Sequence, residues 1–307
     1  MKCGIGNSVL IIGPGAMGLL FAARFERAGM RIGILDHRPE RAQRLQHITL
    51  KEAGPAESQS HVLCRADPRM VAEYSHVLVC VKAQATGAVA QAIAPYIHKK
   101  TRVLSLQNGL GHQEALSVLP CQHHIRAGIT SYGAYLVDEK TVQAAGDGVI
   151  QIGGAAEDAV CLDWKRRLEQ AGFRVERHND ITQMLWKKLI LNASINPVTA
   201  LFGLCNGALP QTSEAWHMAC ALLQESVAVA TAAGIMIDTV VALQDTLRAV
   251  CEATRENRSS MLVDFQAGKP TEVAFMNGII AKEGRRNGIP TPHHDAILLQ
   301  LLGQKST

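Results

Sequence analysis

The stretch Val9-Leu10-Ile11-Ile12-Gly13-Pro14-Gly15-Ala16-Met17-Gly18 decides the fold of this chain. Residues 9–12 form an apolar run typical of a buried strand, and residues 17–28 have the apolar spacing of a helix that Gly29 ends. The residues between match G-x-G-x-x-G, the turn that binds the phosphates of a dinucleotide. The stretch therefore predicts a dinucleotide-binding unit at the start of the chain.

The three glycines of this motif have separate predicted roles. Gly13 allows the tight turn, Gly15 lets the backbone approach a pyrophosphate, and Gly18 lets the helix pack closely on the strand. The free amides at the helix N-terminus then favour the phosphate charge. A plain glycine-rich turn is the alternative, and the flanking strand and helix favour dinucleotide binding.

The rest of the chain divides into a part with strands and a part without them. Further apolar runs at residues 31–35, 77–81 and 103–106 indicate strands of a buried parallel sheet, and short strands follow within residues 125–152. From residue 179 onward the pattern predicts helices only, at residues 180–195, 213–233, 240–261 and 271–287. We expect an α/β fold: a Rossmann-type doubly wound parallel sheet in residues 1–178, followed by an all-helical domain in residues 179–307.

Composition narrows the class of protein. The chain has 307 residues, enough for two domains at roughly 150 residues each, with 47% hydrophobic and 19% charged residues. A net charge of +4 and an aromatic content of 4% speak against nucleic acid as a partner. The first apolar run is too short for an export signal, and residues 219–237 are interrupted by polar side chains, so we expect no membrane span.

The cysteines and histidines show no ligand spacing. Eight scattered cysteines without a C-x-x-C pair indicate reduced, structural thiols, which suits the cytoplasm. His123-His124 and His293-His294 are neighbours in sequence and lack an H-E-x-x-H or cysteine partner, so we expect no metal.

Asp36-His37-Arg38 follows the second strand, where the adenosine ribose of a bound dinucleotide would lie. An acid at this place favours the free 2′-hydroxyl of NAD, whereas an arginine can hold the 2′-phosphate of NADP. Both residue types are present, so the choice stays open. Lys82 and Asn108 each follow a later strand, at the edge of the sheet where ligands bind, although an exposed lysine and a turn asparagine are the alternatives.

A polar row lies on the first helix of the second domain. Lys188, Asn192 and Asn196 are spaced i, i+4 and i+8, which places them on one helix face, while Lys187 belongs to another stripe. If the row faces solvent, it is the wet side of the helix. If it faces a cleft, Lys188 is a candidate acid or base, because burial lowers the pKa of a lysine toward neutrality.

A second polar cluster occurs later in the helical domain. Asn257 and Ser260 are i, i+3 neighbours, and Glu272 lies in the predicted first turn of the next helix. Carboxylates in first turns are favoured by the helix dipole, so a structural role for Glu272 is the alternative to a functional one.

On these motifs the sequence resembles the ketopantoate reductases (2-dehydropantoate 2-reductases) over residues 9 to about 300. The resemblance rests on motifs in the family's order: Gly13 to Gly18, Val81-Lys82-Ala83, Gln107-Asn108-Gly109, Trp186-Lys187-Lys188-Leu189 with Asn192 and Asn196-Pro197, Asn257-Arg258-Ser259-Ser260-Met261, and Thr271-Glu272-Val273 with Asn277-Gly278. The first motif is common to many dehydrogenases, and the last three together are far more specific.

The resemblance implies NADPH-dependent reduction of a 2-keto acid to a 2-hydroxy acid, on the route to pantothenate and coenzyme A. It implies that Lys188 is the general acid and that Glu272 orients the substrate. It also implies substrate binding by Asn108, Asn192, Asn196, Asn257 and Ser260. Cofactor binding is expected from the residues of the Gly13–Gly18 motif, His37, Arg38, Lys82, Asn108 and Glu272, with NADH left open by Asp36.

Two alternatives remain for the function. One is a related dehydrogenase: an enzyme for another 2-keto acid would share the same catalytic positions, whereas one for a 3-hydroxy acid would share the first domain without needing Asn257, Ser260 and Glu272. Another is a non-catalytic sensor that binds NADPH. The sequence is silent on oligomeric state, and a homodimer is also open.

Overall fold

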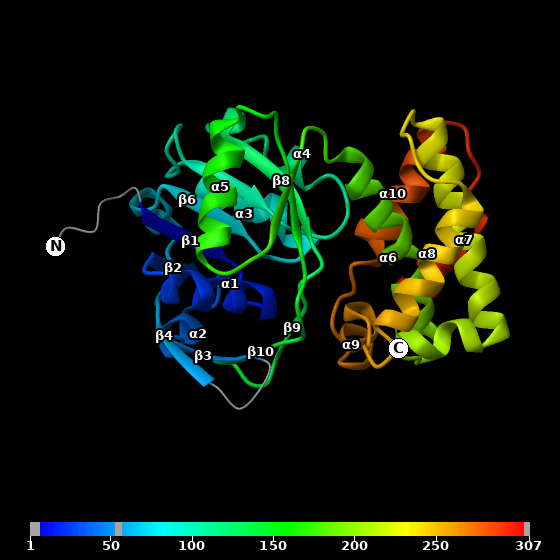
Figure 1. The fold of residues 1–307 in the computed structure, drawn as a ribbon, viewed down its shortest axis with the longest axis horizontal. Helices are drawn as coiled ribbons and strands as arrows, with labels where there is room; N and C mark the ends of the chain where they lie inside the picture. The colour runs from blue at the N-terminus through cyan, green and yellow to red at the C-terminus, as the bar shows by residue number, and fades with distance from the viewer. Residues whose placement is uncertain (1–6, 53–56, 304–307) are drawn as a thin grey trace. The chain divides into compact units, whose positions relative to one another are not determined.

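The computed structural model describes residues 7–52 and 57–303, and the chain divides into two units (Figure 1). Unit 1 runs through Gln107 and resumes from Gly111 to Ile181, whereas unit 2 contains Asn108–Leu110 and the chain from Thr182 onward. Asn108, counted above in the first domain, therefore groups with unit 2. The predicted fold class is confirmed, because unit 1 is built on a largely parallel sheet and unit 2 is helical.

Unit 1 contains all the strands that the structure describes. Its α and β elements are β1 (Ser8–Ile12), α1 (Ala16–Arg27), β2 (Arg31–Leu35), α2 (Pro39–Arg44), β3 (His47–Lys51), β4 (Glu57–His61), β5 (Leu63–Arg65), β6 (His76–Val79), α3 (Thr86–Ile93), β7 (Arg102–Ser105), α4 (His112–Leu116), β8 (Ile125–Thr130), β9 (Ala134–Leu136), β10 (Thr141–Ala144), β11 (Ile150–Gly153), α5 (Ala159–Gln170) and β12 (Val175–His178). Short 3₁₀ turns at Pro68–Glu73, Ala83–Ala85 and Gln122–His124 connect some of them.

The large sheet has the strand order β12-β11-β8-β7-β6-β1-β2-β5. The neighbouring strands β8, β7, β6, β1, β2 and β5 run parallel to one another, whereas β11 pairs with β8 in the antiparallel sense. The chain moves outward from β1 to β2 and β5 on one side, then returns to β6 and β7 on the other. The carboxyl end of β1 is therefore at the switch point where open α/β sheets bind their ligands.

Alternate residues of β1 face opposite sides of the sheet. Val9 and Ile11 pack in a core with side chains of α1 and α5, whereas Leu10 and Ile12 pack in a second core with α3 and α4. Because both faces are covered, all five residues of the strand are buried. This explains why its residues 9–12 are all apolar and do not alternate.

A second sheet of unit 1 has the order β4-β3-β10-β9, and the sequence analysis does not predict β3 or β4. In β3 only Ile48 and Leu50 are buried, while the three polar residues around them are partly exposed. Five residues with two apolar positions give a weak alternation, which explains why the strand escapes a search for apolar runs.

Unit 2 is built from helices: α6 (Thr182–Phe202), α7 (Ser213–Ala232), α8 (Val240–Ala253), α9 (Ser260–Gln266), α10 (Val273–Arg286) and α11 (Pro292–Gly303), with a 3₁₀ turn at Asn206–Gln211. In the described part of the chain, no helix is long and apolar enough to cross a membrane.

Two expectations for these helices are wrong, and one helix was not predicted. Helix α6 does not stop at residue 195 but continues through Pro197 to Phe202. The single helix expected at residues 240–261 is two helices, because the Ser259 hydroxyl accepts a hydrogen bond from the Leu262 amide at 3.1 Å and starts α9 afresh. Helix α11 follows the last predicted one and begins at Pro292, a residue well suited to a first helical position.

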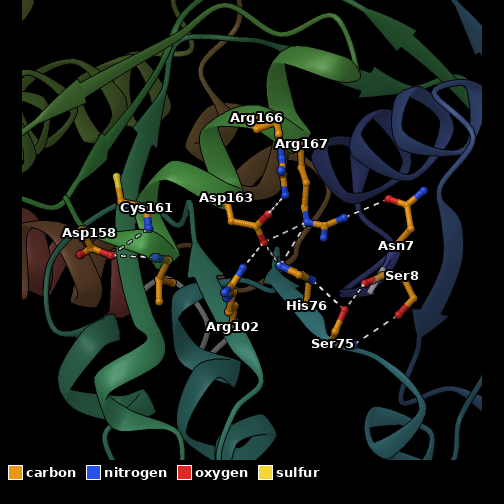
Figure 2. A network of polar contacts seen from close by, with 11 residues as sticks. Asn7, Ser8, Ser75, His76, Arg102, Asp158, Cys161, Asp163, Arg166 and Arg167 are labelled. Atoms are coloured by element: carbon orange, nitrogen blue, oxygen red, sulfur yellow. Dashed lines mark hydrogen bonds and ion pairs between the residues drawn. The ribbon is translucent and has the colours of Figure 1, made fainter. Parts of the chain in front are cut away.

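At the amino-terminal edge of the large sheet, Asp163 of α5 collects several donors (Figure 2). Its carboxylate lies 2.5 Å from Nε2 of His76 at the start of β6 and 3.2 Å from Nε of Arg167. It also accepts hydrogen bonds from Arg102 at the start of β7 and from Arg166. The network therefore fixes α5 to the sheet at the edge opposite the glycine-rich turn.

Electrostatics explain why Asp163 stays ionised inside this network. Burial by itself raises the pKa of the Asp163 carboxyl, but the hydrogen bond from His76, the charge of Arg167 and the hydrogen bond from Arg102 outweigh it and hold that pKa well below its usual range. Burial lowers the pKa of His76, although the hydrogen bond with Asp163 opposes the shift. His76 is therefore neutral at pH 7, and the guanidinium groups balance the carboxylate.

We expect Asp163→Asn to cost about 3 kcal/mol of unfolding free energy, because it leaves the buried guanidinium of Arg167 without its counter-charge. Arg166→Ala is the control, since the Arg166 side chain is 65% exposed and its loss should cost less than about 1 kcal/mol. Urea denaturation measures both. Because the pKa of Asp163 is lower in the folded than in the unfolded chain, its ionised carboxylate stabilises the fold above pH 4, and this stabilisation is lost on acidification. The cost of Asp163→Asn should therefore shrink in acid. Equal costs for the two variants would contradict this account.

Candidate active site

The glycine-rich turn between β1 and α1 is shaped by close backbone approaches. Gly13 has φ of +99°, in the region that favours glycine, and a Cβ there would lie 2.7 Å from Cγ1 of Val81. A Cβ on Gly18 would collide with the carbonyl oxygen of Gly13. The turn therefore requires glycine at both positions for reasons internal to unit 1.

Gly15 differs from the other two glycines because nothing occupies the space around it. It is the N-cap residue of α1, and a Cβ built on it meets no atom within 4 Å. The residue thus exposes backbone at the positive end of a helix without any side chain in front, which is the arrangement that accepts a phosphate group. This fits a dinucleotide.

Asp36, at the end of β2, is buried and surrounded by arginines. Its carboxylate oxygens lie 3.2 Å from Nε of Arg38 and 3.3 Å from Nη1 of Arg41. Arg41 also donates a hydrogen bond of 2.7 Å to the carbonyl oxygen of Pro14, which ties the end of β2 to the glycine-rich turn. His37 and Arg38, predicted to bind the cofactor, are exposed here, whereas Arg41, which the sequence places with Arg38 and Arg44 on a possible solvated helix face, is buried.

The ends of β6 and β7 are joined by Gln107, another residue without a role in the sequence analysis. Its buried side chain donates to the Val81 carbonyl and to Oγ1 of Thr86, both at 2.7 Å. Lys82, the residue after Val81, is exposed and belongs to unit 1.

Asn108 and Gly109 belong to unit 2, and their loop lies against α10. Gly109 has φ of +86°, and a Cβ on it would lie 2.6 Å from the carbonyl oxygen of Phe275. Leu110 packs against the core of the helical unit. Asn108 is half-buried at the start of this docked loop.

The residues of the predicted polar row of α6 become more buried along the helix. Lys188 and Asn192 are half-buried, whereas Asn196 is buried, with Nδ2 3.9 Å from Sδ of Met276 on α10. Lys187 lies on another stripe, where its ammonium forms an ion pair of 2.6 Å with Asp238 at the surface. The two neighbouring lysines therefore have different environments.

Lys188 has the electrostatic property expected of a proton donor near neutral pH. Burial lowers the pKa of its ammonium from 10.5 to about 8, while the negative charge of Glu272 opposes that shift. Glu272 is the N-cap residue of α10, but its side chain does not cap the helix. A capping hydrogen bond therefore does not explain Glu272, although its carboxylate stands at the helix N-terminus, where the dipole favours it, and its charge also acts on Lys188.

The segment from Asn257 to Ser260 contacts α6 through a buried serine. Asn257 and Ser260 are exposed, and the Asn257 carbonyl accepts a hydrogen bond of 3.0 Å from the Asn206 amide. Between them, the buried Ser259 hydroxyl accepts a hydrogen bond of 2.8 Å from Thr199 of α6. Helix α6 also packs against α10, so the helices that bear Ser260 and Glu272 both contact the helix that bears Lys188.

The pair His293-His294 has other partners: Nδ1 of His293 is hydrogen-bonded to the Glu225 carboxylate at 2.6 Å, and His294 is buried in unit 2. Among the described residues, no group of three or more His, Cys, Asp or Glu side chains could hold a metal ion.

The turn, the sheet and the lysine-bearing helical unit define a two-domain, dinucleotide-dependent dehydrogenase. Two family models match the chain: ketopantoate reductase PanE/ApbA over residues 9–157 and the C-terminal domain of the same family over residues 180–305. The chain therefore belongs to the ketopantoate reductase PanE/ApbA family, whose members are NAD(P)-dependent oxidoreductases that act on CH–OH groups.

Individual relatives agree with this assignment over nearly the whole chain. The 2-dehydropantoate 2-reductase of Archaeoglobus fulgidus is 34% identical over 97% of this chain and 98% of its own length. A PanE/ApbA family ketopantoate reductase from Ralstonia eutropha JMP134 has a TM-score of 0.88 and 28% identity, covering 97% of this chain and 98% of that one. D-mandelate dehydrogenase with NADH and anilino(oxo)acetate shares the fold, with a TM-score of 0.86 and 23% identity over 97% and 98% of the two chains.

The glycine geometry predicts that one alanine substitution affects thermal stability and another affects cofactor binding. Gly18→Ala should lower the thermal midpoint of unfolding by several degrees, because a Cβ there overpacks against the Gly13 carbonyl. Gly15→Ala should leave that midpoint unchanged and weaken NADPH binding about tenfold or more, since its methyl group would fill the space in front of the helix N-terminus. Calorimetry and a fluorescence titration measure the two effects. Undiminished NADPH binding by Gly15→Ala would refute the predicted phosphate site.

Proposed function

We propose that the protein reduces the ketone of 2-dehydropantoate to the hydroxyl of pantoate, with Lys188 as the general acid. The observation that carries the mechanism is the lowered pKa of Lys188, about 8, beside the carboxylate of Glu272. Membership of the ketopantoate reductase family supports the reaction itself. The nicotinamide dinucleotide supplies the hydride to the ketone carbon when bound.

Lys188 provides what the ketone oxygen needs during reduction. Hydride addition forms a C–H bond at the ketone carbon and reduces the C=O double bond to a C–O single bond; the negative charge this leaves on the oxygen is stabilised by an ammonium group, which then protonates it. A pKa of about 8 keeps the group mostly protonated at pH 7 and makes its proton easier to transfer than that of an ordinary lysine. Lys188 thus ends the step neutral and is reprotonated from water.

The remaining predicted residues divide by chemistry. Asn192, Asn196, Asn257 and Ser260 offer amide and hydroxyl groups, which suit the carboxylate and the hydroxyl of a keto acid. Glu272 suits the hydroxyl end of 2-dehydropantoate as an acceptor and keeps Lys188 charged. Lys82 and Asn108 are proposed to contact the cofactor and substrate.

We expect Lys188→Ala to lower kcat/KM for 2-dehydropantoate by about 10²–10⁴-fold, the usual contribution of a positioned acid. Lys187→Ala is the matched control: it removes only a surface ion pair and should stay within about twofold of the wild type. Oxidation of NADPH, followed by absorbance with 2-dehydropantoate, pyruvate and benzoylformate, gives the rates and the substrate preference. Wild-type turnover of the other keto acids without 2-dehydropantoate would overturn the proposed substrate.

The pH profile tests the same role. An acid must be protonated, so kcat/KM should be constant below pH 8 and fall above it as the Lys188 ammonium with a pKa of about 8 loses its proton. The residual activity of Lys188→Ala should lack this alkaline decline. An identical decline in that variant would assign the titration to another group.

For the cofactor we propose NADPH. Both carboxylate oxygens of Asp36 are engaged by Arg38 and Arg41, so the acid is poorly placed to bind a ribose diol, while the Arg38 side chain remains 52% exposed. An exposed guanidinium beside a neutralised acid suits a 2′-phosphate. NADH is the second candidate, favoured by the presence of Asp36 itself and by the NADH-bound dehydrogenase of the same fold.

Arg38→Ala should therefore weaken NADPH binding about tenfold and leave NADH binding within about twofold, because it removes one charge-assisted contact to a phosphate. Arg44→Ala, on the same helix but paired with Glu139 at 3.0 Å, is the control and should change neither. Titration with both cofactors measures the ratio. A wild-type kcat/KM with NADH equal to that with NADPH would reverse the proposed preference.

A further inference from the structure

Pro197 lies inside α6, where its missing N–H leaves a gap in the backbone hydrogen bonds. In an α-helix the N–H of residue i bonds to the carbonyl of residue i−4, so the carbonyl of Ala193 has no donor from position 197. Ala193 is fully buried, and water is not at hand to replace that donor. A buried carbonyl without a donor would destabilise the helix.

The missing donor comes from a different helix. Nδ2 of Asn277, on α10, donates a hydrogen bond of 2.9 Å to the Ala193 carbonyl oxygen. Asn277 is fully buried, so this bond forms away from water. One side chain amide thus stands where the backbone amide of residue 197 would act in an uninterrupted helix.

The orientation of the Asn277 amide is set by His294 of α11. Nδ1 of His294 lies 3.1 Å from Nδ2 of Asn277, and Nε2 lies 3.0 Å from the Leu222 carbonyl. Burial lowers the pKa of His294 to about 4, so the ring is neutral, and the carbonyl requires the ring hydrogen to be on Nε2. Nδ1 is then an acceptor, and both neighbours of Asn277 Nδ2 accept hydrogen bonds.

We propose that Asn277 is a positioning residue for the reduction: its amide replaces the N–H that Pro197 lacks and thereby fixes the segment of α6 between Asn192 and Asn196. This inference rests on the proposed function of α6. Ala193, the residue held, directly follows Asn192. Asn196 contacts Met276, the residue before Asn277.

The same interface aligns the proposed acid with its carboxylate. Glu272 is the N-cap of α10, and Met276 and Asn277 lie on the next turn of that helix. The Asn277–Ala193 bond is therefore a buried, directional contact between α6 and α10, the helices that bear Lys188 and Glu272. An error of about 1 Å in such a placement can cost about 10²-fold in rate.

The test is a double-mutant cycle between positions 277 and 197. Asn277→Leu keeps the size of the side chain and removes both amide hydrogens, so kcat/KM for 2-dehydropantoate should fall at least about tenfold while the Kd for NADPH stays unchanged. Pro197→Ala restores the backbone N–H to the Ala193 carbonyl. In that background we expect Asn277→Leu to cost less than about threefold. Full additivity of the two substitutions would overturn the proposal.

The readouts separate positioning from mere stability. A purely structural role predicts a lower denaturation midpoint for Asn277→Leu but wild-type kcat/KM in the folded fraction, and that outcome would also overturn the proposal. If Asn277→Leu does not fold alone, folding in the Pro197→Ala background supports it, and failure in both backgrounds contradicts it. Asn277→Ser, which keeps one donor hydrogen, should lose less kcat/KM than Asn277→Leu.

The cycle also distinguishes this inference from the proposed function. If the wild type does not turn over 2-dehydropantoate, the proposed function fails. The coupling between positions 197 and 277 in the denaturation midpoint then still shows whether Asn277 replaces the missing N–H, and kcat/KM is read with the keto acid that the protein does reduce.

Discussion

Helix α6 is at once the buried centre of unit 2 and the bearer of its polar row, and the rest of the unit is arranged around that conflict. A buried polar group costs free energy unless it is hydrogen-bonded. The Ser194 hydroxyl bonds back to the Ile190 carbonyl, Thr199 bonds to Ser259, and Asn277 bonds to Ala193. Apolar helices can slide past one another at little cost, whereas the Thr199–Ser259 and Asn277–Ala193 bonds permit one register of α6 against α9 and α10.

Unit 1 differs in this respect, because it must leave backbone groups without hydrogen-bond partners at one edge of the sheet. At the amino-terminal edge, Asp163 gathers arginines and a histidine into a closed network. At the carboxyl edge, Arg41 closes the charge of Asp36 and holds Pro14, while Gly15 stays open in front of α1. The carboxylate of Asp36 is thus compensated beside the turn, while the helix N-terminus stays open where a phosphate is expected.

The sequence predicts those features that depend on neighbours along the chain. The turn from Gly13 to Gly18 and the spacing of Lys188 on α6 are local patterns, and the structure has both the turn and the helix. The path of α6 through Pro197 could not be predicted, because a proline ends a helix unless a donor arrives from elsewhere. That donor, Asn277, is 84 residues away from Ala193 in sequence. The contact of Arg41 with Pro14 could not be predicted for the same reason, since Pro14 is outside the helix of Arg41.

The pair of Lys188 and Glu272 shows why the site needs both charges and not the lysine alone. Full burial of an isolated lysine can lower its pKa to about 5–6, which would leave it neutral and useless as an acid at pH 7. The Glu272 carboxylate opposes the effect of burial, and the pKa settles at about 8. The two groups are therefore coupled, and a change in Glu272 alters the protonation of Lys188 even where it does not touch the substrate. Because Lys188 is on α6 and Glu272 is at the start of α10, the acidity of the proposed catalyst depends on how those two helices are held together.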